Sequence, residues 1–133
     1  MSKEEQLIEA IDSEDIDSIK DLIKKGANIN KKYDDIYTIG EKILLSLDTF
    51  EYDSSLLKTL IRKKVNLNVK NEDGYTLLMT IFGEPEDMLY NNIKTVITLL
   101  VNKADPNIQD NQGATALYIL CFNYVWVIRH MTL

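Results

Sequence analysis

The chain is short of the residues on which most catalytic and metal sites depend. Its 133 residues include one cysteine and one histidine, so it cannot form an intrachain disulfide, nor a structural zinc site by itself. We expect Cys121 to be a buried small hydrophobic residue and His130 to face solvent or cap a helix. The five glycines form no phosphate-binding loop. The sequence therefore predicts a protein that is not an enzyme, with no catalytic residue, no cofactor and no metal site.

Positive charge is scarce as well. The chain carries 15 basic and 21 acidic residues, which gives a formal net charge of −6 at pH 7. Because affinity for nucleic acid comes largely from lysine and arginine at phosphates, we expect no nucleic-acid partner. The acidic balance favours solubility and suits a basic partner. A single cysteine is typical of reducing compartments, so we expect a cytoplasmic protein, with delivery into a host cell as an alternative.

Long apolar runs are missing too. Residues 1–6 lack the apolar core of a secretory signal. The most apolar stretch, residues 116–128, is 13 residues long and contains Asn123, whereas a membrane-spanning helix needs about 20 apolar residues. We therefore expect no membrane partner, and we predict a buried helix pair at this end of the chain.

What the chain does contain is one short phrase that recurs three times, each time after a pair of aliphatic residues. Its copies are Gly26-Ala27-Asn28-Ile29-Asn30, Lys64-Val65-Asn66-Leu67-Asn68 and Lys103-Ala104-Asp105-Pro106-Asn107. The last asparagines of successive copies are 38 and 39 residues apart. Self-similarity at such a period indicates a stack of repeated units, which presents an extended surface more readily than a catalytic cleft.

Each unit carries the signals of two short helices. In the first unit, apolar residues three or four positions apart form one stripe on each predicted helix, namely Leu7, Ile8, Ala10 and Ile11, then Ile16, Ile19, Leu22 and Ile23. Gly26 supplies a left-handed residue that ends the second helix. Thr76 and Thr115, 39 residues apart, stand where helix N-caps belong. Helices this short need packing against one another to be stable.

Four segments together carry a family resemblance: Gly74-Tyr75-Thr76-Leu77-Leu78, Gly113-Ala114-Thr115-Ala116-Leu117, Gly26-Ala27-Asn28-Ile29-Asn30 and Ala104-Asp105-Pro106-Asn107. They resemble the ankyrin repeat, whose pattern is D-x-x-G-x-T-P-L-H-x-A followed by a G-A-D-x-N loop. The proline of the pattern is replaced by Leu77 and Ala116, and its histidine by Met79 and Tyr118. The second unit departs further, because only Thr38 keeps the turn signature. The resemblance implies an all-α ankyrin-repeat solenoid with short hairpin-like turn tips.

The resemblance assigns the chain to a single domain of about four helix–turn–helix units, at residues 1–32, 33–70, 71–109 and 110–133. The last unit stops within its second helix. Because the usual ankyrin period is about 33 residues, five or six extra residues are expected between the helices of the second and third units. The candidate segments are 47–53 and 83–90. Their apolar residues either form an exposed contact surface or fold back over the outer helices: Phe50, Tyr52, Met88, Leu89 and Tyr90.

In ankyrin-like proteins the partner lies along the concave side and touches the turn tips and the first helix of each unit. The positions that this resemblance carries over are Lys32, Asp34, Asp35, Tyr37, Lys70, Glu72, Asp73, Tyr75, Gln109, Asn111, Gln112 and Ala114. Tyr37 and Tyr75 occupy the same place in adjacent units, and large stiff rings suit binding hot spots. The two rings either bind a partner as an exposed pair or pack on neighbouring tips.

The predicted function is non-catalytic recognition of another protein. One narrower version is an acidic inhibitor or immunity-type protein that masks a basic target enzyme, and another is a host-directed adaptor. A third alternative is a homodimer formed through the apolar segment at residues 124–128, which lacks the polar outer face of a terminal repeat. These alternatives share one fold and differ in the partner, which the fold does not specify.

Overall fold

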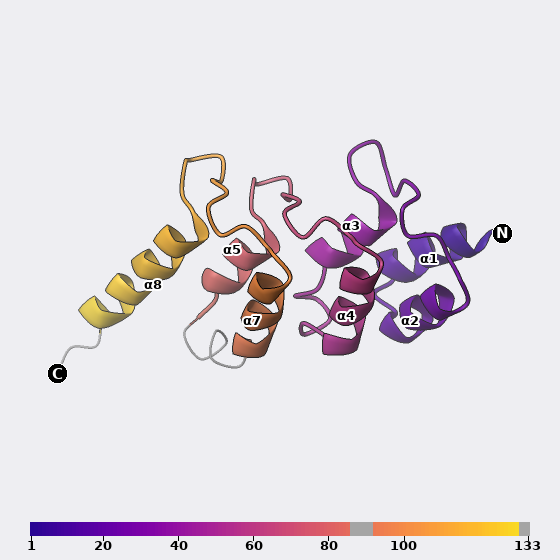
Figure 1. The fold of residues 1–133 in the computed structure, drawn as a ribbon, viewed down its shortest axis with the longest axis horizontal. Coiled ribbons are helices and arrows are strands. Elements are labelled where there is room, and N and C mark those ends of the chain that lie inside the picture. Colours follow the sequence, from indigo (N-terminus) through magenta and orange to yellow (C-terminus); the bar gives the residue numbers. More distant parts are fainter. Residues whose placement is uncertain (86–91, 131–133) are drawn as a thin grey trace. The chain divides into compact units, whose positions relative to one another are not determined.

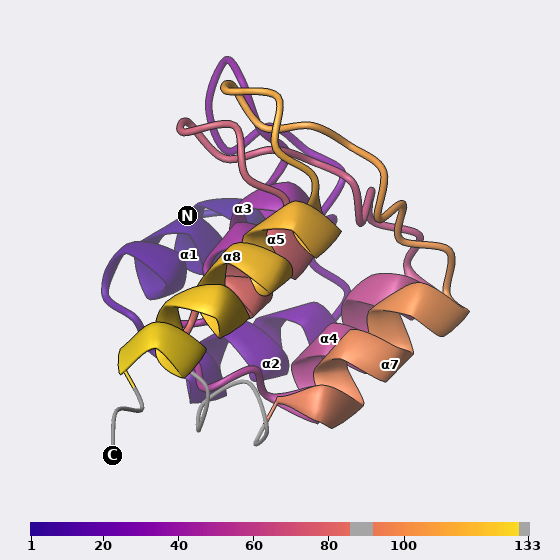
Figure 2. The same cartoon turned by 90° about the vertical axis from the view of Figure 1, so that its left-hand side faces the viewer.

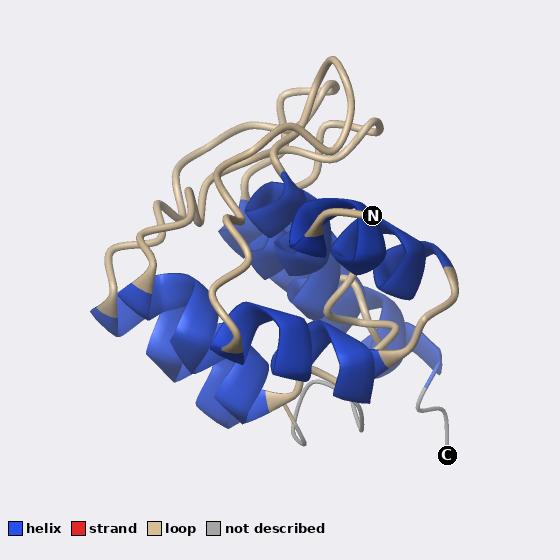
Figure 3. Cartoon of the chain, turned by 90° about the vertical axis from the view of Figure 1, so that its right-hand side faces the viewer, coloured by secondary structure: helices blue, strands red, loops and turns tan. Residues whose placement is uncertain are grey.

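The structure, a computed structural model, describes residues 1–85 and 92–130, apart from the side chains at 126–128 and 130. Within these residues there are seven helices and no strand, which confirms the all-α prediction (Figure 3). The chain divides into two compact units, Met1–Asn66 and Leu67–Leu133. Figure 1 labels the helices along the chain.

The first unit is built from two helix pairs. Its helices are α1 (Lys3–Asp12), α2 (Ile16–Lys24), α3 (Ile39–Leu45) and α4 (Ser54–Arg62). Helix α1 packs against α2, and α3 packs against α4. The predicted stripes on the first pair are confirmed, because their buried members are Leu7, Ala10, Ile11, Ile19, Leu22 and Ile23. Burial of these faces holds together helices that are too short to be stable in water alone.

Every helix of the first unit is preceded by an N-cap residue. The side chain of this residue accepts a hydrogen bond from the backbone N–H three residues later. These N-cap residues are Ser2, Asp15, Thr38 and Asp53. At Thr38 the cap is reciprocal, since the Glu41 carboxylate also accepts from the Thr38 N–H at 2.9 Å. Each cap satisfies an N–H group that the helix itself leaves without a partner, which is worth about 1 kcal/mol.

The repeated phrase of the sequence is a repeated chain reversal at the ends of α2, α4 and a later helix, α7 (Ile93–Val101). Gly26, Lys64 and Lys103 all have a left-handed backbone, with φ of 96°, 63° and 72°. In each case the next residue donates its N–H to a carbonyl five residues earlier, over 2.9 to 3.1 Å. This confirms the prediction for Gly26. It also shows that lysine takes the glycine position in the two later copies, at some cost in backbone strain.

The long period arises between the helices of a pair. Residues 13–15 join α1 to α2, whereas residues 46–53 join α3 to α4, so the extra residues lie where they were predicted. Leu47, Phe50 and Tyr52 in this longer connection are buried, which confirms that it folds back onto its own unit. The second predicted insertion cannot be followed in the same way, because Met88, Leu89 and Tyr90 lie outside the described residues.

In the second unit the described helices are α5 (Leu77–Phe82), α7 (Ile93–Val101) and α8 (Ala116–His130). Helix α5 packs against both α7 and α8 (Figure 2). The Asn123 side-chain amide on α8 donates to the carbonyl of Glu84 at 2.7 Å and more weakly to that of Phe82 at 3.4 Å. These bonds satisfy carbonyl groups at and just beyond the end of α5, and they attach the middle of α8 to it.

The prediction of a buried helix pair at residues 116–128 is wrong. The segment forms one helix of 15 residues, α8, because no glycine or proline interrupts it. Its described side chains are mostly exposed, and Cys121 is among them, so the prediction of a buried thiol is also wrong. Among the described residues, no helix has the length and apolar character needed to cross a bilayer.

Candidate binding surface

Three turns of the same design precede α3, α5 and α8. In each, a backbone N–H donates to a carbonyl four residues later: Tyr33 to Tyr37 at 2.9 Å, Asn71 to Tyr75 at 2.8 Å, and Asp110 to Ala114 at 2.8 Å. The first residues of these turns are 38 and 39 positions apart, the same steps as the repeated phrase. The turns therefore belong to the repeat, and each presents its middle residues at a tip.

A side-chain oxygen inside each turn fixes its backbone. Asn71 Oδ1 accepts from the N–H groups of Asp73 and Tyr75, and Asp110 Oδ1 accepts from the equivalent groups two and four residues later. In the first turn the acceptor is displaced by one residue, since Asp34 Oδ1 accepts from Ile36 and Tyr37 at 2.8 and 2.7 Å. The bonds from the Tyr37 and then the Ile36 N–H lower the pKa of Asp34 below its usual value.

The first turn is also anchored to its own unit through Tyr33. Its hydroxyl donates to the Asp12 carboxylate at 2.6 Å, and Lys42 Nζ lies 5.3 Å from the centre of its ring. The bond to Asp12, with partial burial, raises the pKa of Tyr33 to about 12, so the hydroxyl stays protonated and keeps donating. The base of this turn is closed by an antiparallel bridge between Lys32 and Thr38, which corresponds to the predicted hairpin-like tip.

In the second unit the two turns lie against each other. A Cβ atom added to Gly74 would stand 2.4 Å from Asn111 Oδ1 and 2.9 Å from the Asn111 backbone nitrogen. The loops that lead to these two turns are joined as well, because the Asp105 N–H donates to Asn68 Oδ1 at 2.7 Å. Together they form one surface, the unit 2 tip surface, which consists of Glu72, Asp73, Tyr75, Asn111 and Gln112.

The predicted site residues of the first unit divide into two groups. Lys32, Asp34 and Asp35 are exposed, but Tyr37 is buried, with 7% of its surface accessible. Of the two alternatives for these rings, an exposed Tyr37–Tyr75 pair is therefore excluded, because Tyr37 is buried. In this turn Ile36 stands where the other two turns have glycine. Ile36 precedes Tyr37 directly, and 69% of its surface is accessible. Asp34 accepts from the N–H groups of both residues, and in this turn Ile36 faces solvent while Tyr37 is buried.

Most predicted site residues of the second unit are exposed. Those that face solvent are Lys70, Glu72, Asp73, Gln109, Asn111 and Gln112. Tyr75 is only partly exposed, with 37% of its surface accessible, and Ala114 is half-buried. The structure thus brings part of the predicted set together on the unit 2 tip surface, while Lys70 and Gln109 lie beside it in the sequence.

Sequence reasoning pointed to the apolar segment at residues 124–128, whose side chains at 126–128 lie outside the described residues, but it missed the rest of an apolar face on α8. Leu117, Tyr118, Phe122 and Val125 are between 50% and 64% exposed, at helical spacings that place them on one side. The rings of Tyr118 and Phe122 stack with centroids 6.4 Å apart. The helical spacing of these apolar residues could have predicted the exposed face, but the segment was expected to form a buried helix pair. Patches of this kind commonly mark contact sites.

Among the described residues, no group of three or more histidine, cysteine, aspartate or glutamate side chains could hold a metal ion. Comparison of the sequence with known protein families and with curated proteins finds no match to this chain. A functional proposal therefore depends on the repeat, the three turns and the exposed side chains.

The contact between the two turns of the second unit can be tested with a pair of alanine substitutions. Gly74 and Gly113 have nearly the same backbone, with φ of 86° and 85°, but an added Cβ meets nothing within 4 Å at Gly113. We expect Gly113→Ala to cost about 1–2 kcal/mol of unfolding free energy through backbone strain. Gly74→Ala should cost at least about 1 kcal/mol more, because it also displaces Asn111. Urea denaturation measures both, and equal losses would show that the turns do not abut.

Proposed function

We propose that the chain is an ankyrin-like repeat protein that binds another protein without catalysis, through its turn tips and the concave side that those tips border. The supporting observation is that three turns share one backbone design while their exposed residues differ. The turns expose Asp35 and Ile36 in the first, Glu72 and Asp73 in the second, and Asn111 and Gln112 in the third. A constant scaffold with varied side chains suits recognition of a partner surface.

The tips also suggest the character of the partner. Acidic residues occur on the first two tips, at Asp34, Asp35, Glu72 and Asp73, in a chain whose net charge is −6. A partner with a basic surface would be attracted to them over several ångströms before contact. The acidic inhibitor is therefore the version of this function that the charges favour, with Tyr75 as the aromatic contact on the unit 2 tip surface.

Affinity capture with matched charge variants tests this proposal. Glu72→Lys/Asp73→Lys reverses the tip charges, whereas Glu9→Lys/Asp48→Lys makes the same change in net charge at exposed positions away from the tips. We expect the wild type and the second variant to retain a common partner, and the tip variant to lose it by at least about tenfold, as repelling charges replace attracting ones. Mass spectrometry identifies the retained protein. Equal capture by both variants would place the binding surface elsewhere.

Association kinetics separate the inhibitor version from the adaptor version. With a basic partner, the association rate should fall steeply as salt is added, because screening shortens the reach of the tip charges. A rate that does not change with salt contradicts the inhibitor version.

We also propose a second candidate, self-association through α8, which the exposed apolar face of that helix favours. Its exposed aromatic pair, Tyr118 and Phe122, would be desolvated between two copies of the chain, and burial of apolar surface is the main driving force for such contacts. In this case α8 would be the interface and the turn tips would stay available for a different protein.

Light scattering of the full chain at micromolar concentration tests self-association. We expect a mass of twice 15.3 kDa for the wild type and of 15.3 kDa for Phe122→Glu, since a charge buried in an apolar interface is strongly unfavourable. Val101→Glu introduces the same charge at a residue of α7 that is 73% exposed, and it should remain dimeric. A monomeric wild type would remove this candidate.

A further inference from the structure

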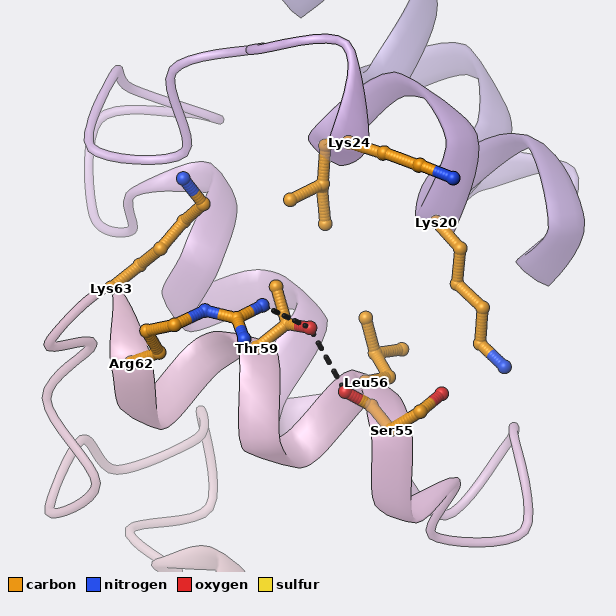
Figure 4. A pocket seen from close by; sticks show the side chains of 8 residues that line it. Lys20, Lys24, Ser55, Leu56, Thr59, Arg62 and Lys63 are labelled. Atoms are coloured by element: carbon orange, nitrogen blue, oxygen red, sulfur yellow. Dashed lines mark hydrogen bonds between the residues drawn. The ribbon is translucent and has the colours of Figure 1, made fainter.

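A hollow lies between α2 and α4 within the unit Met1–Asn66, and none of its lining residues belongs to a turn tip. Its volume is about 470 Å³, which falls in the range of ligand-binding sites. Helix α2 contributes Lys20, Ile23 and Lys24, and α4 with the residue after it contributes Ser55, Leu56, Thr59, Arg62 and Lys63 (Figure 4). Neither the repeat nor the proposed tip surface accounts for it.

The lining of this hollow is basic, in contrast to the acidic chain. Four of its residues carry positive charge and none is acidic. One of the four, Lys20, is committed to Asp53, whose Oδ2 lies 2.7 Å from Lys20 Nζ. Partial burial of Asp53 favours its protonated form, but the bonds from Lys20, the Leu56 N–H and Ser55 outweigh this and lower its pKa to about 2. Asp53 therefore stays ionised and keeps Lys20 paired.

The other three cations are available to a ligand. Arg62 donates only a 3.3 Å hydrogen bond to Thr59 Oγ1, and within the described residues no carboxylate forms an ion pair with Arg62, Lys24 or Lys63. Figure 4 shows these groups around the hollow, with Lys24 on one side and Arg62 and Lys63 on the other. At physiological salt, screening limits the interaction between exposed charges to about 8 Å. The electrostatic potential in the hollow is therefore set mainly by its own cations and less by acidic residues elsewhere in the chain.

Between the cations, the floor of the hollow is aliphatic. Ile23 and Leu56 come from the two helices and are largely buried, with 4% and 1% of their surfaces exposed. The Ser55 hydroxyl already donates to Asp53, and the Thr59 hydroxyl donates to the Ser55 carbonyl. Neither hydroxyl therefore needs a hydrogen-bond acceptor from a ligand. Because Ile23 and Leu56 are almost fully covered, a ligand would meet mainly the methylene stems and charged ends of the basic side chains. A small inorganic anion would contact the cations but leave most of the 470 Å³ hollow unfilled.

We propose that this hollow binds an acidic peptide segment of a partner protein, in which an aliphatic side chain is flanked by carboxylates. The aliphatic side chain packs on the methylene stems of the basic residues that line the hollow, and the carboxylates on either side pair with Lys24 and with Arg62 and Lys63. The inference goes beyond the proposed tip function, because it concerns a second surface with the opposite charge preference.

Fluorescence anisotropy with a synthetic probe tests this site on the full chain. The probe is a fluorescein-labelled peptide in which a central leucine is flanked by three glutamates on each side. Lys24→Glu/Lys63→Glu should weaken its binding by at least about tenfold, since like charges then face each other. Lys58→Glu/Lys94→Glu makes the same change in net charge at exposed lysines outside the hollow and should bind the probe like the wild type. Lys24→Gln/Lys63→Gln, which introduces no repulsion, should show a smaller loss in the same direction.

The competing outcomes are distinct. A probe with serine in place of leucine should bind more weakly, and inorganic phosphate should compete poorly. Equal loss of binding in the two glutamate variants would mean that net charge alone is sensed, and would overturn the proposal. Full displacement by phosphate, with no preference for leucine over serine, would make the hollow a simple anion site and would overturn it as well. Neither result depends on whether the tip surface binds a partner, because the probe and the variants do not involve the tips.

Discussion

Mutual burial of short amphipathic helices is the constraint on which the rest of this structure depends. The described helices before α8 are between six and ten residues long, below the length at which a helix is stable in water without tertiary contacts. Each therefore needs the apolar stripe of a neighbour, as α1 has in α2 and α5 has in α7 and α8. Chain reversal at a left-handed residue after α2, α4 and α7 makes this pairing recur along the sequence.

Because the helices carry the stability of the fold, the turns can vary without loss of the fold. Their backbones are held locally, by one N–H to carbonyl bond and one side-chain acceptor in each turn. The first turn shows that this backbone design tolerates substitutions. Its acceptor is Asp34, the second residue of the turn, whereas the other turns use their first residue, and Ile36 stands where the others have glycine. Exposed residues between these fixed points are free to match a partner, which is the physical basis of the function proposed for the tips.

Much of the fold could be predicted from local signals. The 38- and 39-residue steps, Gly26 and the capping threonines act over a few residues, and each of these predictions was confirmed. The features that sequence reasoning missed depend on tertiary neighbours instead. Tyr37 is buried although Tyr75, at the same place in the next turn, is 37% exposed, and the described side chains of α8 are mostly exposed although the helix packs against α5. Likewise Lys24 and Lys63 line one hollow only once α2 and α4 are folded in the same unit.

Site-specific photo-crosslinking tests the central claim most directly, namely that the turn tips meet a partner protein. A photoreactive phenylalanine analogue placed at Gln112 reports on the unit 2 tip surface, and the same group at Lys94, exposed near the start of α7, serves as the reference. The account predicts a discrete adduct with one partner from position 112 and none from position 94. An adduct from position 94 with none from position 112 would contradict it.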